Sequence, residues 1–200
     1  MKKLFLAVAL FCVTPVAQAS LVTVELVGVG DSIPYHGVLA GYYIAKINGV
    51  EKRVVCEDFT TWVNLGQTWQ AYEYTYADIQ AGASTKFSGA QKYSEVGWLF
   101  SQMASATPGA RAQMQGAMWN IMTPGSVVMD PLAQSYYHQA TDGTHNTFDF
   151  SGVGKVLTPN PYRSGQDFFV VTAPVPLPAG MLLFMSGLAS LSWFARKRHH

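Results

Sequence analysis

The feature of this chain that most restricts its fold is an uncharged apolar segment near the C-terminus, residues 179–195, with the sequence AGMLLFMSGLASLSWFA. As a helix rising ~1.5 Å per residue it would span about 26 Å, close to the ~30 Å hydrocarbon core of a bilayer. Arg196, Lys197 and Arg198 follow it directly, and basic residues beside a membrane helix stay on the cytoplasmic side. The sequence therefore predicts a single-pass transmembrane helix over 179–195, a cytoplasmic anchor in the basic tail 196–200, and a body on the far side of the membrane.

The N-terminus predicts the same orientation. Two lysines precede an apolar run over residues 4–13, and the small residues Ala17 and Ala19 follow in an A-x-A pattern. This order is typical of a secretory signal peptide, and the apolar run is only half of the ~20 residues that a spanning helix needs. We therefore expect signal peptidase to remove residues 1–19, rather than an uncleaved anchor, and the body, residues 20–173, to be exported.

A proline-rich motif lies directly ahead of the C-terminal apolar segment, and its prolines exclude a helix or a central strand. The motif comprises Val175, Pro176, Leu177, Pro178 and Ala179. Together with the apolar helix and the basic tail, it resembles the PEP-CTERM sorting domain of exosortase systems, with Leu177 in place of the usual glutamate. The resemblance implies that an exosortase-type transpeptidase processes residues 174–200 and delivers the protein to the cell surface or extracellular matrix. A plain C-terminal membrane anchor is the alternative.

Charge is distributed unevenly between the ends of the chain and its body. The chain has 13 Lys and Arg and 12 Asp and Glu. Five of the basic residues lie at the two ends, so residues 20–195 carry eight basic and 12 acidic residues, a net charge of −4. An acidic body without a basic stripe argues against nucleic-acid binding.

The body contains no pattern that identifies an enzyme. His36, His138 and His145 lack the spacing of metal-binding motifs, and no Gly-x-Ser-x-Gly nucleophile motif is present. Glu57 and Asp58 are adjacent, and adjacent strand residues point to opposite faces, so we expect a surface pair rather than acid–base partners. We predict no catalytic residue, no metal and no cofactor, and a structural or adhesive role in the cell envelope or a biofilm.

The body is predicted to be an α+β domain. Strand patterns occupy 21–29, 41–55, 67–76 and 166–173, and helical patterns run through 88–104, from Pro108 to Pro124, and from Pro131 to Tyr137. Asn48-Gly49 lies between two strand-like runs and suits a type I′ turn, which needs positive φ at both positions. This order favours an antiparallel sheet or sandwich with a helical pair packed on one end.

Cys56 and Gln115 are the candidate reactive residues. Cys56 is the single cysteine left after signal removal, so no intramolecular disulfide can form. Gln115 falls within the apolar sector of its predicted helix, where an unpartnered carboxamide would cost ~1–3 kcal/mol, and Gln113, Gly116 and Asn120 lie on the opposite face. Residues 115–119, QGAMW, resemble the Gln-x-Ala-Ile-Trp segment of thioester domains in bacterial surface adhesins, in which a cysteine on an earlier strand is bonded to the glutamine. The resemblance implies a Cys56–Gln115 thioester.

Two alternatives to the thioester are open. Cys56 can be a small buried hydrophobe while Gln115 satisfies carbonyls at a strand edge. The body can also bind carbohydrate, because aromatic rings stack on sugars and sorting of this kind accompanies exopolysaccharide production in the family. The aromatic residues that would form such a face are Trp62, Trp69, Tyr72, Tyr74 and Tyr76.

Overall fold

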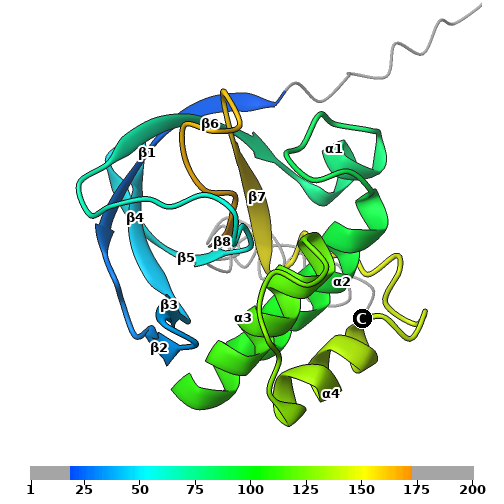
Figure 1. The fold of residues 1–200 in the computed structure, drawn as a ribbon. Coiled ribbons are helices and arrows are strands. Elements are labelled where there is room, and N and C mark those ends of the chain that lie inside the picture. Colours follow the sequence, from blue (N-terminus) through cyan, green and yellow to red (C-terminus); the bar gives the residue numbers. More distant parts are fainter. Residues whose placement is uncertain (1–18, 173–200) are drawn as a thin grey trace, which may run out of the picture.

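Six antiparallel strands close into a barrel in the computed structural model, which describes residues 19–172 (Figure 1). Around the barrel the strands follow the order β1 (Ser20–Gly28), β4 (Tyr43–Ile47), β5 (Val50–Cys56), β8 (Phe168–Val171), β7 (Gly154–Pro159) and β6 (Thr68–Tyr74). The barrel closes because β1 pairs with both β4 and β6. The predicted signal peptide, apart from Ala19, and the predicted sorting signal lie outside the described residues.

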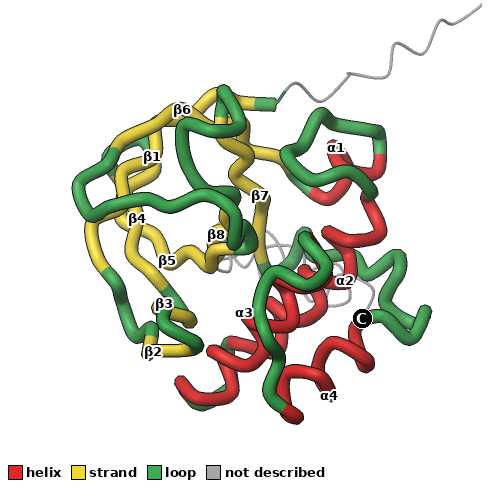
Figure 2. The backbone as a smooth tube through the Cα atoms, in the orientation of Figure 1, coloured by secondary structure: helices red, strands yellow, loops and turns green. Residues whose placement is uncertain are grey.

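The α+β class and the antiparallel sheet are confirmed, and the sheet closes into a barrel instead of forming a sandwich. The closure comes from β7, a strand that none of the predicted strand patterns covers. Its six residues pair with β6 on one side and β8 on the other, and Figure 2 shows this strand between its two neighbours. Without β7 the sheet would keep two free edges, so one short strand decides between an open sheet and a barrel.

The predicted hairpin between β4 and β5 is confirmed. Asn48 and Gly49 have φ values of 49° and 81°, and both must be positive in a type I′ turn. The Asn48 side chain also accepts a hydrogen bond from the backbone N–H of Thr23 at 2.9 Å. The turn is therefore fastened to β1 as well as to its own two strands.

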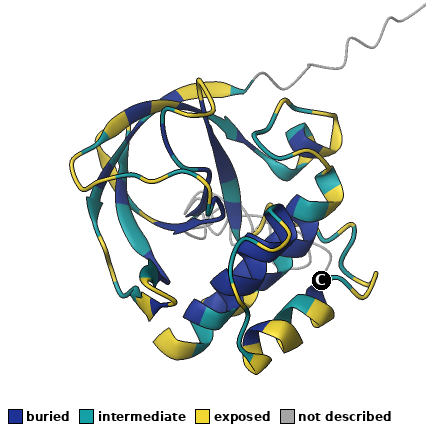
Figure 3. Ribbon diagram, viewed as in Figure 1, coloured by how far each residue is buried: buried dark blue, intermediate teal, exposed yellow. Residues whose placement is uncertain are grey.

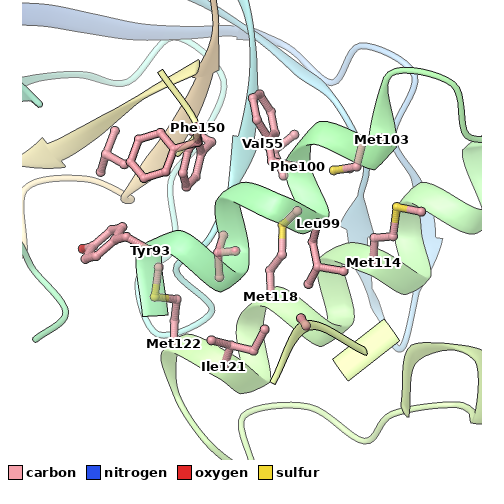
Figure 4. Packing of buried hydrophobic residues seen from close by; sticks show 14 of the residues in the cluster. Val55, Tyr93, Leu99, Phe100, Met103, Met114, Met118, Ile121, Met122 and Phe150 are labelled. Atoms are coloured by element: carbon pink, nitrogen blue, oxygen red, sulfur yellow. The ribbon is translucent and has the colours of Figure 1, made fainter. Parts of the chain in front are cut away.

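Four helices lie between β6 and β7 in the sequence and pack against one side of the barrel (Figure 1). They are α1 (Tyr76–Gln80), α2 (Ala90–Met103), α3 (Pro108–Met122) and α4 (Pro131–Ala140). The α2 and α3 helices confirm the predicted helical pair, and α3 and α4 both begin at a proline, whose missing N–H costs nothing at the first helical position. The core between the helices and the barrel contains Leu99 and Phe100 from α2, Met118 from α3 and Val55 from β5 (Figure 4).

Helix α3 is buried on almost every side (Figure 3). The sequence pattern placed Gly116 and Asn120 on a face opposite the apolar sector, but both are buried. Gly116 is covered by a small hairpin, β2 (Ile33–Tyr35) and β3 (Val38–Ala40), which contacts α3. Asn120 is covered by the segment after the helix, where its side chain bonds the Gly125 N–H and the Val127 carbonyl. The helix is therefore held between the rest of the helical layer and this hairpin.

Gly116 lets the β2–β3 hairpin approach α3 closely. A Cβ at this position would lie 2.6 Å from the Tyr35 hydroxyl oxygen and 2.7 Å from its ring. Gly116→Ala should therefore lower the free energy of unfolding by about 1–3 kcal/mol, measured by urea denaturation. Gly109→Ala is the matched control in the same helix, because its Cβ would meet nothing within 4 Å, and it should be neutral or stabilising by up to ~1 kcal/mol. Equal effects of the two substitutions would contradict this packing.

Candidate functional site

A pocket of about 460 Å³ opens at one end of the barrel. Strands β1 and β5 finish at this end, and β4 and β8 begin there, because neighbouring strands are antiparallel. Its walls come from this barrel end, the loop over residues 57–66, the β2–β3 hairpin and helix α3. The residues that matter chemically are Cys56, Asp58, Trp119 and Gln166.

The pocket is mainly apolar, and most of its polar groups already have partners. The Tyr43 hydroxyl donates to the Leu39 carbonyl, and Gln166 Nε2 donates to the Thr61 carbonyl at 2.5 Å. The buried indole N–H of Trp119 has no hydrogen-bond partner within residues 19–172. Trp62 lies at the rim and is 70% exposed. The pocket therefore combines an apolar lining with the indole N–H of Trp119, which lies beside the Cys56 thiol.

The Cys56 thiol borders this pocket from the inside of the barrel. Cys56 packs with the cluster of apolar residues inside the barrel that includes Val54 and Phe168. Its thiol donates a hydrogen bond to the Asp58 carbonyl oxygen at 3.0 Å. Burial, followed by the charge of Asp58, raises the pKa of the thiol well above its usual range, although the Trp119 side chain acts in the opposite direction. The thiol therefore holds its proton at neutral pH.

The Gln115 carboxamide is fully buried and bound at both ends. Its Nε2 donates to the Cys56 carbonyl oxygen at 2.7 Å, and its Oε1 accepts from the Gly41 backbone N–H at 2.5 Å. Trp119 follows one helical turn later on the same side of α3, where it borders the Cys56 thiol. The structure thus brings the two predicted residues together across 59 positions of sequence, with the Cys56 sulfur as a free thiol.

Comparisons of the chain with family models, with curated proteins and with solved structures find no match. Within residues 19–172 no helix combines the length and the apolar character needed to cross a bilayer. The same part of the chain contains no cluster of three or more His, Cys, Asp or Glu side chains arranged to hold a metal ion. The function of the site therefore has to be inferred from its own geometry and chemistry.

Glu57 and Asp58 are buried, so the expected surface pair is wrong. Both residues are 0% exposed. The β5–β8 pairing continues beyond Cys56, because the Glu57 N–H donates to the Asp167 carbonyl at 3.1 Å. Glu57 and Asp167 are therefore opposite one another on neighbouring strands, where side chains share a face. Tyr93 of α2 donates to the Asp167 carboxyl at 3.1 Å, so this face lies under the helical layer.

The two opposed acids hold their protons. Burial, followed by the charge of Asp167, raises the pKa of Glu57 well above its usual range. Burial also raises the pKa of Asp167 to about 8, against the lowering effect of the Tyr93 hydrogen bond. Like charges this close in a buried site cannot both ionise at low cost. The sequence could have suggested this pairing of Glu57 with Asp167 only if strand β5 had been predicted to continue past Cys56.

The five aromatic residues proposed for carbohydrate binding do not share one face. Trp69 and Tyr74 are buried, and Trp62 is exposed at the pocket rim. Tyr72 and Tyr76 pack against the helical core. The histidines are also separate: His36 binds Asp130 at 3.2 Å, and His145 stacks on Trp98 with ring centroids 4.0 Å apart.

Proposed function

We propose that this chain is an exported cell-surface or matrix protein with an adhesive, non-catalytic role, and that Cys56 and Gln115 form an internal thioester in its body. The apolar and charged patterns of the two ends support export and exosortase-type sorting. The observation that carries the thioester is the hydrogen bond between Gln115 Nε2 and the Cys56 carbonyl, which holds a buried carboxamide against the main chain of the residue that bears the buried thiol.

The proposed bond forms by attack of the Cys56 sulfur on the Gln115 side-chain carbonyl carbon. The carbon–nitrogen bond of the carboxamide breaks, ammonia leaves with the thiol proton, and a sulfur–carbon bond replaces it. The Gly41 N–H already binds the carboxamide oxygen, where it would stabilise the negative charge that develops during attack. The two residues are already bonded through the Cys56 main chain, so the reaction needs a local rearrangement of side chains and no encounter step, which supports it.

The pocket supplies the route by which another molecule would reach the bond. Cys56 contributes to its lining and Trp62 to its exposed rim. An amine or hydroxyl on another surface could attack the thioester carbonyl there, release the Cys56 thiol and remain attached to Gln115. Surface polysaccharide belongs among the proposed partners because it presents hydroxyl groups.

Mass spectrometry of the protein recovered from its exporting cell tests both parts of this proposal. We expect a chain that begins at Ser20, has lost its C-terminal sorting segment and is lighter by one further ammonia. Cys56→Ala should restore the ammonia, whereas Gln113→Ala, two residues from Gln115 in the same helix, should not.

Two outcomes would count against the two parts separately. A body at full mass with a thiol that titrates under denaturing conditions would refute the thioester and leave sorting intact. A native chain that still carries Met1 and His200 would refute export and sorting.

A further inference from the structure

Lys86 and Asp58 form the most buried ion pair in the described part of the chain. The two side chains are 11% and 0% exposed, whereas the acidic partners of Arg111 and Lys155 are 39% and 22% exposed. The Coulombic attraction within a buried ion pair is largely offset by the hydration that both charges lose on burial. Stability alone is therefore a weak reason for this pair.

The contacts around Asp58 distinguish its two carboxyl oxygens. Oδ1 accepts from the Thr60 backbone N–H at 2.8 Å and from the Thr60 hydroxyl at 2.7 Å. Oδ2 is in direct contact with Lys86 Nζ, which also donates to the Thr61 hydroxyl at 2.6 Å. One oxygen thus occupies a two-donor site suited to an oxyanion, and the other lies against an amine.

Two further buried acids, Glu57 and Asp167, influence the electrostatics of this pair. Glu57 adjoins Asp58 in sequence and is fully buried, and neither of its carboxyl oxygens has a hydrogen-bond partner within the described residues. Asp167, opposite Glu57, is close enough for its titration to respond to both Lys86 and Asp58. Both acids are protonated at neutral pH, as described above, so they add no negative charge that would hold Lys86 as an ammonium ion.

We propose that Lys86 Nζ and the Asp58 side-chain carboxyl condense into an intramolecular isopeptide bond. Proton transfer within the pair first gives a neutral amine and a neutral acid. The Lys86 nitrogen then attacks the Asp58 carboxyl carbon, and Thr60 binds the developing charge on Oδ1. Oδ2 leaves as water and takes its second proton from the attacking Lys86 nitrogen. An ammonium and a carboxylate become one amide and one water, with no oxidant or co-reactant.

The bond would tie the helical layer to the barrel. Asp58 lies in the loop after β5, and Lys86 lies in the segment between α1 and α2. A covalent link between these segments would hold the helices on the barrel under pulling or heating. It does not depend on the thioester, because the isopeptide bond removes water and the thioester removes ammonia.

Trypsin digestion of the denatured full-length protein tests the proposal. Arg53, Lys86 and Lys92 are consecutive cleavage sites, and an acylated lysine is not cleaved. We expect residues 54–92 as one peptide, lighter by one water, with fragment ions only from outside a ring closed between Asp58 and Lys86. Treatment with hydroxylamine before digestion opens a thioester and leaves this amide in place. The presence or absence of the isopeptide bond is therefore measured independently of the thioester.

Lys86→Arg keeps the charge and the cleavage site but cannot form the amide, so it should yield residues 54–86 at full mass. Lys155, in the exposed pair with Glu73, is the internal control and should be cleaved normally. A wild-type peptide 54–86 at full mass would overturn the proposal. A peptide 54–86 that has lost one water but is cleaved normally after Lys86 would also overturn it, because that pattern indicates a cyclic imide at Asp58. The wild-type result decides even if the variant does not fold.

Discussion

Replacing Gln115 with alanine should lower the free energy of unfolding by about 2–6 kcal/mol, because two buried backbone groups lose their side-chain partner. The Gly41 N–H would have no replacement acceptor for the bond it now makes to Gln115 Oε1, and the Cys56 carbonyl would lose its Nε2 donor. The truncated side chain would also leave a void beneath α3. Urea denaturation of the full chain, followed by circular dichroism, measures the loss.

Gln113→Ala is the matched control for this substitution. Gln113 lies on the same helix and is only partly buried, and its amide donates to the Asp130 carboxylate near the surface at 3.0 Å. We expect this variant to lose about 1 kcal/mol or less. If the two variants proved equally stable, Gln115 would not fasten α3 to the barrel.

The protein should be less stable at pH 8 than at pH 5, with a loss on the order of 3 kcal/mol. The pKa of Asp167 is raised to about 8 in the folded protein, against ~3.9 in an unfolded chain. Stability from a raised pKa is fully present below the unfolded value and is lost as pH rises through the folded value, at about 1.4 kcal/mol per pH unit. The raised pKa of Glu57 acts in the same direction. Urea midpoints measured from pH 5 to pH 8 would show the decline.

Asp167→Asn isolates the source of this pH dependence. Asparagine cannot ionise, and its side-chain oxygen can still accept from Tyr93, as the carboxyl does at 3.1 Å. We expect the free energy of unfolding of the variant to change less between pH 5 and pH 8 than that of the wild type. The stability of the variant relative to the wild type should therefore increase as the pH rises. A wild-type profile that is level or rising over this range would show that the buried acids are not neutral in the folded protein.

Several local features of the body were predictable from sequence because each depends on residues close together in the chain. The Asn48-Gly49 turn follows from the φ preferences of two residues. The starts of α3 and α4 follow from Pro108 and Pro131, which are favoured at the first helical position. The burial of Gln115 followed from helical periodicity, although the same projection left Gly116 and Asn120 on an exposed face.

The candidate site was only partly predictable. Cys56 and Gln115 could be paired by resemblance, but the sequence did not show that the carboxamide would bond to the Cys56 carbonyl and the Gly41 N–H. The buried state of Glu57 was missed because it depends on Asp167, more than a hundred residues later. Strand alternation predicted that Glu57 and Asp58 point to different faces, but it could not show that both residues are buried.

From the sequence alone we predict an N-terminal signal and a sorting segment over 174–200, and the sequence also determined local structure in the body: the Asn48-Gly49 turn and the first residues of α3 and α4. These depend on apolar length, charge position and backbone preference, all of which are local. The tertiary structure decided the closure of the barrel through β7, the meeting of Gln115 with Cys56, and the burial of Lys86 against Asp58. Such contacts depend on strand register and on which layer covers which face, and distant residues set both together.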